Sequence, residues 1–366
     1  MFVINKKSLK SFDWISLSII IAISLVGLLF IFSATHQSDA PYSIFFKKQL
    51  FGIISGVFLY ILFSFIDYRQ LMRLGYFFYF AILGLLAFTI IKGSIGMGAK
   101  RWVDLIIFKG QPSELSKLLF PAFAVYFLYT QKNNQNLSFS FKDFIPVLIT
   151  LFVTVLLVLR QPDLGTALII LFIGLIILWL AGIGKKFFIY LTILCLAAAP
   201  LFWQRLKPYQ KKRVEVFLGY GESRKERYQI EQSHISIGSG GFFGKGILKG
   251  TQNRFSFLPE SRTDFIFAVI CEEWGFLGAF LVIILYSLLF LRIFFIILRL
   301  YPPLMQIFAI GIILHIFLSA TINMLMVTGL LPIVGIPLPL VSYGLSNLWT
   351  TFISLGWLNS IKIQKL

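Results

Sequence analysis

The sequence predicts an all-α polytopic membrane protein with about ten transmembrane helices. The chain of 366 residues is 58% hydrophobic and 17% aromatic, but only 13% charged. Its mean hydropathy of +0.86 corresponds to more apolar surface than a water-soluble fold can bury. Apolar stretches of about 20 residues, long enough to cross a bilayer, start near Trp14, Gln49, Tyr76, Glu114, Ile145, Thr166, Phe187, Phe265, Met305 and Leu345.

The first apolar stretch, Trp14 to Ala34, is predicted to stay in place as an uncleaved anchor. It follows Lys6, Lys7 and Lys10, it is longer than the apolar region of a signal peptide, and further spans come after it. Lys and Arg are more frequent in the loops on the same side of the membrane as the N-terminus than in the short loops on the other side. Because cytoplasmic loops are enriched in Lys and Arg, we predict that both termini lie in the cytoplasm.

The net charge of +18 does not by itself indicate a nucleic-acid-binding protein. Lys and Arg lie in short loops and in one long segment, residues 205–263, so membrane topology and lipid headgroups account for them better than a nucleic-acid partner does. We predict one membrane domain over residues 1–366. Residues 205–263 form its long extracytoplasmic loop between the seventh and eighth helices, and a connection of that length is usually functional.

The sequence motifs predict neither a metal cage nor a nucleotide-binding loop. Cys195 and Cys271 lie in apolar segments without a CxxC pattern, and the three His residues are scattered. The segment GSGGFFGKGILKG fails as a Walker A motif, because Ser239 stands in place of its first Gly and Gly246 in place of its Ser/Thr. Two interpretations stay open, a flexible turn or a loop whose backbone amides approach an anion.

Asp264 is the first candidate for chemistry, because it stands at the mouth of an apolar run. Glu260 and Arg262 precede it, and Glu272 and Glu273 follow two turns later. Ionisable groups beside a membrane span tend to be paired or functional, since an unpaired charge there is costly. Asp264 is also well placed to cap the helix that follows, so a structural role is the competing interpretation.

A second group of charges flanks the span that starts near Glu114. Lys100 and Arg101 precede it, and Glu114 and Lys117 lie in its first turns. Side chains at i and i+3 share a helix face, so Glu114 and Lys117 can simply neutralise each other. In the functional interpretation, the three basic residues contact a pyrophosphate and Glu114 orients a cation.

Two further breaks on the same predicted face carry polar residues. RQPDLG supplies Arg160 and Asp163 where one helix ends and the next begins, and GIPLPLVSYG supplies the hydroxyls of Ser342 and Tyr343 in a hairpin broken by Pro and Gly. Broken backbone at membrane depth is tolerated only where it is buried or lines a cavity. The sequence therefore predicts one extracytoplasmic cavity, basic with a few carboxylates, of the kind that suits a lipid-linked anionic sugar.

These motifs resemble those of the SEDS family. GAKRW, QPSELSK, QPDLGTA, KPYQKKRVEVFL, GFFGKGILKGTQ, FLPESRTDFIFAVICEEWGFLGA and NMLMVTGLLPIVGIPLPLVSYG follow the family order from about Gly98 to Gly344. YQKKR, GTQ and FLPE are more similar to the rod-elongation branch than to the division branch. The chain departs from the family pattern at Arg262, where His is usual, and at Leu345 and Asn347, where Gly and Ser are usual.

The resemblance implies a peptidoglycan glycosyltransferase that polymerises lipid II at the outer face of the bacterial cytoplasmic (inner) membrane during cell elongation. It implies Asp264 as the catalytic residue, and the residues expected to bind substrate are Lys100, Arg101, Glu114, Lys117, Asp163, Arg213, Glu260, Arg262 and Ser342. The implied partners are a class B penicillin-binding protein (a transpeptidase like PBP2) and other elongation proteins. No cofactor is expected to be built in, and a divalent cation, Mg²⁺ or Mn²⁺, is left open.

The implied reaction suits these residues. An α-linked sugar pyrophosphate becomes a β-1,4 glycan, so one displacement with a carboxylate as general base suffices, and such a base contributes about 10²–10⁴-fold. Cationic groups stabilise the departing pyrophosphate. The alternatives are a lipid II flippase, which needs polar groups near the membrane midplane, a scaffold, which leaves Asp264 unexplained, and a division-specific polymerase of the same family.

Overall fold

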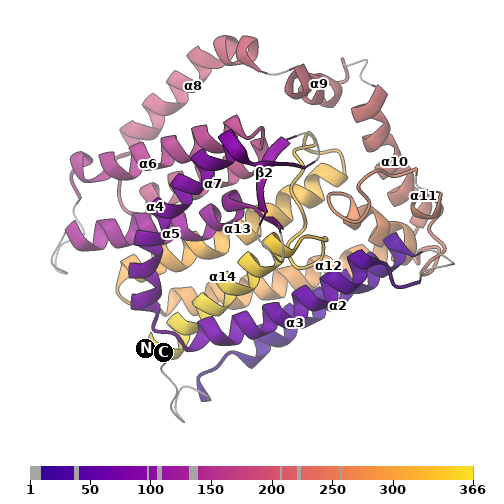
Figure 1. Cartoon of the computed structure of the whole chain (residues 1–366), viewed down its shortest axis with the longest axis horizontal. Helices are drawn as coiled ribbons and strands as arrows, with labels where there is room; N and C mark the ends of the chain where they lie inside the picture. The colour runs from indigo at the N-terminus through magenta and orange to yellow at the C-terminus, as the bar shows by residue number, and fades with distance from the viewer. Residues whose placement is uncertain are drawn as a thin grey trace.

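The protein is a bundle of long helices, and a small sheet lies in the connection between α4 and α5 (Figure 1). The computed structural model describes residues 10–36, 41–96, 99–104, 109–131, 139–206, 208–220, 224–255 and 257–365. The long helices are α2 (Trp14–Thr35), α3 (Ile44–Phe65), α4 (Tyr68–Lys92), α5 (Pro112–Gln131), α6 (Phe141–Arg160), α7 (Leu164–Leu180), α8 (Lys185–Arg205), α12 (Ile266–Leu298), α13 (Pro303–Val327) and α14 (Leu345–Lys365).

The predicted all-α membrane fold is confirmed. Each apolar stretch of the sequence coincides with one of the long helices. Within the described residues, six helices are long and apolar enough to cross a membrane, namely α2, α3, α4, α6, α12 and α13. The exact number of spans and their orientation stay predictions.

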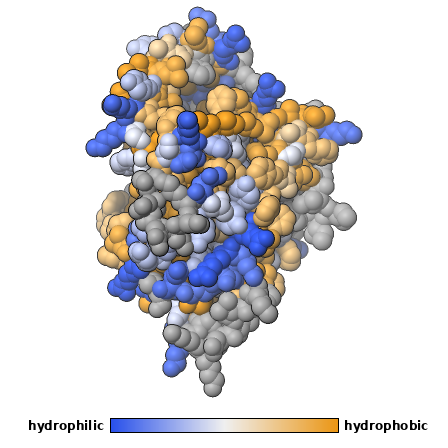
Figure 2. All heavy atoms as spheres, turned by 90° about the vertical axis from the view of Figure 1, so that its left-hand side faces the viewer, coloured by the Kyte–Doolittle hydropathy of each residue, from blue (hydrophilic) through white to orange (hydrophobic). Residues whose placement is uncertain are grey.

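The surface of the bundle has the pattern of a membrane protein. Along α3, for example, Phe51, Ile54 and Phe58 are each more than half exposed, as suits side chains that face lipid. The face shown in Figure 2, which is the left-hand side of Figure 1, is different, because hydrophilic residues gather across it and apolar residues flank them. A polar end and apolar flanks fit a bundle whose helices run across the bilayer.

Polar caps fix where several of the helices begin. Asp13, Ser43 and Asp67 precede α2, α3 and α4, and each side chain accepts a hydrogen bond from a backbone N–H two or three residues later. Such a cap satisfies one of the backbone donors that an α-helix leaves unpaired at its start. In an apolar chain this need is strong, because no water is available in the bilayer core.

Helix α14 packs along α3 at close range. A Cβ atom on Gly56 of α3 would lie only 2.3 Å from the Phe352 ring of α14, and one on Gly52 would lie 2.6 Å from Leu345. Small residues at such contacts let two membrane helices approach closely and gain van der Waals packing. This packing fixes the start of α14 against α3.

The long segment between α8 and α12 contains three short helices, α9 (Pro208–Phe217), α10 (Arg224–Gly240) and α11 (Thr251–Arg254). Helix α10 lies against α12, where a Cβ on Gly240 would clash with the Cys271 carbonyl oxygen at 1.9 Å. Helix α12 itself is broken at Gly275, whose φ of 65° is one that glycine adopts without strain.

A small antiparallel sheet was not predicted from the sequence. It contains β1 (Ser94–Gly96), β2 (Ala99–Asp104) and β3 (Lys109–Gly110) in the order β1-β2-β3. The strands are too short to show a clear alternating pattern in the sequence. The sheet matters because β2 carries Arg101 into the site described below.

The predicted orientation can be tested with single cysteines in a background of Cys195→Ser and Cys271→Ala. Tyr220→Cys, in the loop after α9, should react with a membrane-impermeant maleimide in intact spheroplasts. Tyr301→Cys, between α12 and α13, is the matched control and should react only after lysis. Both positions are strongly exposed, 86% and 78% respectively, so access to the reagent decides the labelling. The opposite pattern would invert the topology.

Candidate active site

Asp264 lies in the turn that leads into α12, and its side chain is half-buried. Among the described residues, no group donates a hydrogen bond to its carboxylate. The N-cap of α12 is Phe265, without a side-chain cap bond. The interpretation of Asp264 as a helix cap is therefore wrong, because the cap position falls on the next residue, Phe265, and no backbone N–H of α12 donates to the Asp264 carboxylate.

Four charged groups act on the Asp264 carboxyl. Burial raises its pKa to about 6, and the charge of Glu260 adds to that shift. Arg213 and Arg101 act in the opposite direction, and Asp163 raises the pKa further. The residues whose charges act on Asp264 come from α9, β2, the start of α7 and the turn before α12.

The turn that carries Asp264 is fixed by the loop before α14. Ser342 donates from Oγ to the Thr263 carbonyl oxygen at 2.6 Å, and the Tyr343 N–H donates to the Arg262 carbonyl oxygen at 2.9 Å. Ser342 Oγ also accepts a hydrogen bond from the Leu338 N–H at 2.8 Å. The predicted role of Ser342 as a hydroxyl donor to substrate is thus corrected, because the hydroxyl is buried and bound to backbone on both sides.

Asn323 of α13 also binds this turn, and its role was not predicted from the sequence. Its side-chain nitrogen donates to the carbonyl oxygens of Asp264, at 2.9 Å, and of Ile336, at 2.7 Å. Gly335 lies next to the carboxylate, and a Cβ there would come within 3.4 Å of Asp264 Oδ2. An uncharged polar residue inside an apolar helix was the available signal, since such residues in membrane spans usually have a specific partner.

Glu260 and Arg262 flank the turn in different ways. The Glu260 carboxylate accepts a hydrogen bond from Thr263 Oγ1 at 3.1 Å. The Arg262 guanidinium lies 4.0 Å above the Phe45 ring of α3, a cation–π contact. Glu260 therefore faces the turn and adds negative charge beside Asp264, whereas Arg262 is held against α3.

Arg101 and Asp163 are joined through the break between α6 and α7. Arg101 donates to the carbonyl oxygens of Gln161, at 3.0 Å, and of Pro162. Asp163 caps α7, and its Oδ2 accepts a hydrogen bond from Gln111 Nε2 at 2.9 Å. The QPD motif thus holds a guanidinium and a carboxylate at the edge of the site. Lys100 belongs to β2, but its side chain lies outside what the structure describes.

Glu114 and Lys117 form a buried ion pair in the first turns of α5. Their side chains are 5% and 1% exposed, and Lys117 Nζ lies 2.8 Å from Glu114 Oε1. Asn347 of α14 donates to Glu114 Oε2 at 2.9 Å. The mutual neutralisation that the spacing allows is present, so Lys117 is not free to contact a pyrophosphate and Glu114 is not free to orient a cation. Asn347, one of the departures from the family pattern, completes the network.

The glycine-rich segment has a role that neither sequence interpretation included. Its backbone N–H groups at Lys245 and Gly246 donate to the carbonyl oxygens of Glu272 and Glu273 at 3.0 and 2.9 Å, where α12 is broken. Lys245 Nζ also lies 2.7 Å from Glu272 Oε1. The segment is therefore docked on α12 next to Gly275, and it is neither an anion-binding loop nor a free turn.

Removing Lys117 should destabilise the protein strongly, because it leaves the Glu114 carboxylate buried without its cation. For Lys117→Met we expect a loss of about 3–5 kcal/mol in the free energy of unfolding, and the double variant Glu114→Gln/Lys117→Met should recover most of it. The exposed pair Arg227 and Glu231 on α10 is the control, and Arg227→Met should cost less than about 1 kcal/mol. Thermal unfolding in detergent measures all three, and no recovery in the double variant would contradict the ion-pair explanation.

Comparison with known proteins places the chain in a family. The chain is 36% identical to the peptidoglycan glycosyltransferase MrdB of Escherichia coli K12 over 351 residues, covering 95% of this chain and 93% of that protein. It is 37% identical to MrdB of Helicobacter pylori 26695 over 363 residues, covering 98% and 92%. It is 29% identical to the peptidoglycan glycosyltransferase RodA of Treponema pallidum, covering 98% and 99%.

Two solved structures are similar over nearly the whole length. One comes from a study of the structural coordination of polymerization and crosslinking by a peptidoglycan synthase complex, with a TM-score of 0.80 and 28% identity, covering 96% of this chain and 97% of that chain. The other is the rod shape determining protein RodA of Thermus thermophilus, with a TM-score of 0.70 and 26% identity, covering 97% of both chains. A model of the family described as cell cycle protein FtsW/RodA/SpoVE matches residues 13–366. As its motifs predicted, the chain belongs to the FtsW/RodA/SpoVE family of multi-pass membrane proteins.

Proposed function

We propose that this protein is a peptidoglycan glycosyltransferase that polymerises lipid II into glycan strands during cell elongation. The observation that carries the proposal is the Asp264 carboxyl, which has no hydrogen-bond donor among the described residues and a pKa of about 6. A general base works best when its pKa lies near the working pH. The MrdB relatives support this reaction over the alternatives, because they are named peptidoglycan glycosyltransferases and are 36% and 37% identical to this chain in sequence.

In the proposed reaction, Asp264 accepts the proton of the acceptor sugar's 4-hydroxyl. The acceptor oxygen then forms a bond to the anomeric carbon of the donor, and the bond from that carbon to the pyrophosphate oxygen breaks. Undecaprenyl pyrophosphate leaves with the bonding electrons, and the α-linkage of the donor becomes β-1,4. One carboxylate suffices, because an inverting displacement needs no covalent enzyme intermediate.

Arg213 and Arg101 are the groups we assign to the leaving pyrophosphate. Both guanidiniums lower the pKa of Asp264 through their charge, which supports assigning them to an anion at this site. Guanidinium groups bind phosphate oxygens with two parallel hydrogen bonds and stabilise the charge that develops as the bond breaks. Asp163 orders this edge of the site by holding Gln111 and the start of α7.

We propose that a divalent cation, Mg²⁺ or Mn²⁺, binds at this site only when the substrate supplies part of its ligands. In the part of the chain that the structure describes, no three His, Cys, Asp or Glu side chains are grouped closely enough to hold a metal ion. Mg²⁺ is commonly bound by one or two carboxylates and by substrate phosphates. Glu260 and Asp163 carry oxygens of the required type, and the pyrophosphate would supply the other ligands.

The proposed location is the bacterial cytoplasmic membrane, with the site on its extracytoplasmic face. The proposed partner is a class B penicillin-binding protein that crosslinks the new strand, together with other elongation proteins. Support comes from the similar structure, which belongs to a complex that coordinates polymerization and crosslinking. The orientation rests on the distribution of Lys and Arg in the loops.

Asp264→Asn should abolish polymerisation of purified lipid II while leaving the melting temperature nearly unchanged. The exchange removes the proton acceptor, and no cap bond depends on the carboxylate. Since the raised pKa shows that burial disfavours the charged form, a neutral amide should not lower stability. Glu231→Gln on α10 is the control and should keep full activity. Wild-type activity in Asp264→Asn, or movement of lipid II between leaflets without polymer, would contradict the proposal.

The rate of polymerisation should fall below about pH 6, because Asp264 must be deprotonated to accept a proton. Glu260→Gln removes a negative charge that raises the pKa of Asp264, so the falling limb should move to lower pH. Arg213→Gln removes a positive charge and should move it to higher pH. Rates measured from about pH 5 to 8 test both shifts against Glu231→Gln. Identical profiles for all variants would exclude Asp264 as the titrating base.

A further inference from the structure

Gln161 lies at the C-terminal end of α6, and its side chain is bound to another helix. The residue is 2% exposed, and its Nε2 donates to the Leu86 carbonyl oxygen at 3.0 Å and to Thr89 Oγ1 at 2.6 Å. Both acceptors belong to the last turns of α4, and Thr89 Oγ1 itself donates to the Leu86 carbonyl oxygen at 2.8 Å. The buried amide therefore fixes the end of α6 to the end of α4.

The main-chain carbonyl of the same residue binds Arg101 of β2. Arg101 Nε donates to the Gln161 carbonyl oxygen at 3.0 Å, and Arg101 Nη2 donates to the Pro162 carbonyl oxygen. Gln161 is the C-cap of α6, where a helix leaves its carbonyl groups without helical partners. A cation at this end also interacts favourably with the helix dipole. The end of α6 is thus a natural place to hold a guanidinium.

These contacts orient the Arg101 guanidinium without neutralising it, because both acceptors are uncharged. In the part of the chain that the structure describes, no carboxylate forms an ion pair with Arg101. Further N–H groups of the guanidinium remain for an anion. The charge of Arg101 also acts on Asp264, whose pKa it lowers. The connection therefore runs from α4 through the Gln161 amide to its carbonyl, and from there to a cation of the candidate active site.

Helix packing alone does not account for a glutamine at this position. Its Oε1 atom is buried and has no hydrogen-bond partner among the described residues. An unpaired buried acceptor lowers stability, whereas an apolar side chain of similar shape often replaces buried polar groups at little cost. A role in positioning Arg101 accounts for the polar side chain. The competing interpretation is a link that only joins α4 and α6.

We propose that Gln161 is a positioning residue, which holds the Arg101 guanidinium where it stabilises the departing pyrophosphate. This inference rests on the proposed function, in which Arg101 binds that leaving group. Gln161 acts only through Arg101, by fixing the carbonyl oxygen that the guanidinium binds. Loosening this carbonyl moves the cation away from the point where negative charge develops, and a displacement of about 1 Å lowers a rate by up to about 10²-fold.

The test measures lipid II polymerisation by the purified full-length protein in Gln161→Leu, Arg101→Gln and the double variant. Gln161→Leu keeps the main-chain carbonyl, and Thr89 can still donate to Leu86. It should lower kcat about ten-fold with little change in KM, because the weakened contact belongs to the transition state. Arg101→Gln should lower kcat about 10²-fold. Adding Gln161→Leu to Arg101→Gln should have no further effect, since Gln161 acts through Arg101.

The pH dependence of the rate separates positioning from a purely structural link. Arg101 lowers the pKa of Asp264, so Arg101→Gln should move the falling acid limb to higher pH. Gln161→Leu should move the limb in the same direction by a smaller amount, and the double variant should match Arg101→Gln. A link that only stabilises the bundle would lower the melting temperature and leave the limb in place.

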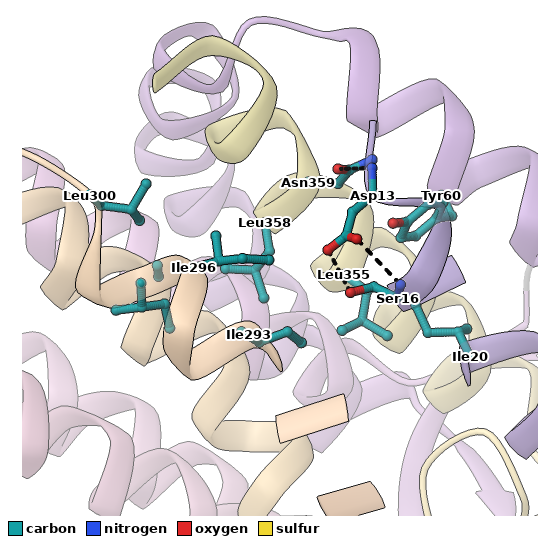
Figure 3. Close-up of a pocket in the computed structure, with 12 residues that line it drawn as sticks. Asp13, Ser16, Ile20, Tyr60, Ile293, Ile296, Leu300, Leu355, Leu358 and Asn359 are labelled. Atoms are coloured by element: carbon teal, nitrogen blue, oxygen red, sulfur yellow. Dashed lines mark hydrogen bonds between the residues drawn. The ribbon is translucent and has the colours of Figure 1, made fainter. Parts of the chain in front are cut away.

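Asn359→Leu is the matched control, because it removes another buried amide that joins segments at the remote end of the bundle. Asn359 Nδ2 donates to Ser64 Oγ at 3.1 Å, and Asn359 Oδ1 accepts a hydrogen bond from the Asp13 N–H at 3.2 Å (Figure 3). This variant should lower the melting temperature but keep the kcat and the pH profile of the wild type.

A second pair of variants carries the test if Gln161→Leu does not fold. Thr89→Val removes one acceptor of the Gln161 amide while keeping the shape of the side chain. It should lower kcat and move the acid limb to higher pH, whereas Thr89→Ser keeps the hydroxyl and should behave as the wild type does.

The inference is overturned if Gln161→Leu lowers kcat further in the Arg101→Gln background. It is also overturned if Arg101→Gln moves the acid limb while folded Gln161→Leu, or Thr89→Val in its place, keeps the limb of the wild type. Failure of the proposed function gives a different result, because Asp264→Asn would then polymerise lipid II or Arg101→Gln would change neither kcat nor the limb. Either of those results would overturn this inference as well.

Discussion

The structure depends on keeping one carboxylate unpaired at the mouth of an apolar bundle. Asp264 has no hydrogen-bond donor among the described residues, although it is half-buried and close to other charges. Such a group is costly, and the surrounding fold must hold it in place by its backbone instead. Ser342, Tyr343 and Asn323 do this by binding the carbonyl groups of the turn, so the carboxylate itself stays available to a substrate.

Three other buried carboxylates show the contrast. Glu114 is bound to Lys117 and Asn347, Glu272 to Lys245, and Asp13 to Arg292. In each of these three a cation lies within 2.8 Å of a carboxylate oxygen, so the negative charge is neutralised. Asp264 differs because its neighbours, Arg213 and Arg101, act on it through their charge while Arg101 is bound to backbone carbonyls. Burial raises the pKa of Asp264 to about 6, the charge of Glu260 adds to that shift, and the two guanidiniums oppose it.

Helix α12 connects the candidate active site with the Arg292–Asp13 ion pair at the other end of the bundle. Asp264 precedes its first turn, Gly275 breaks it next to the docked glycine-rich segment, and Arg292 meets Asp13 near its end. The break lets the first turns of α12 be positioned by α10 and the loop after it. Its far end is held separately, by α2 and by the ion pair between Arg292 and Asp13.

The membrane fold, the positions of the long helices and the family were all predictable from the sequence. Apolar stretches of bilayer length are a property of local composition, and the motifs are read directly from residue order. The sequence also indicated which polar residues deserved attention, since ionisable groups are rare in such a chain. Glu114 and Lys117 could even be recognised as a possible pair, because a spacing of three residues fixes their relative position on a helix.

What each polar group contacts depends on how distant segments of the chain pack together. Ser342 binds the Thr263 carbonyl oxygen, 79 residues away, and Asn347 binds Glu114, 233 residues away. Neither contact leaves a local pattern, because both depend on how α14 packs beside α3 and α5. The same holds for Asp264, which local spacing suggested as a helix cap, whereas the packing of the turn against α13 and the loop before α14 leaves its carboxylate uncovered.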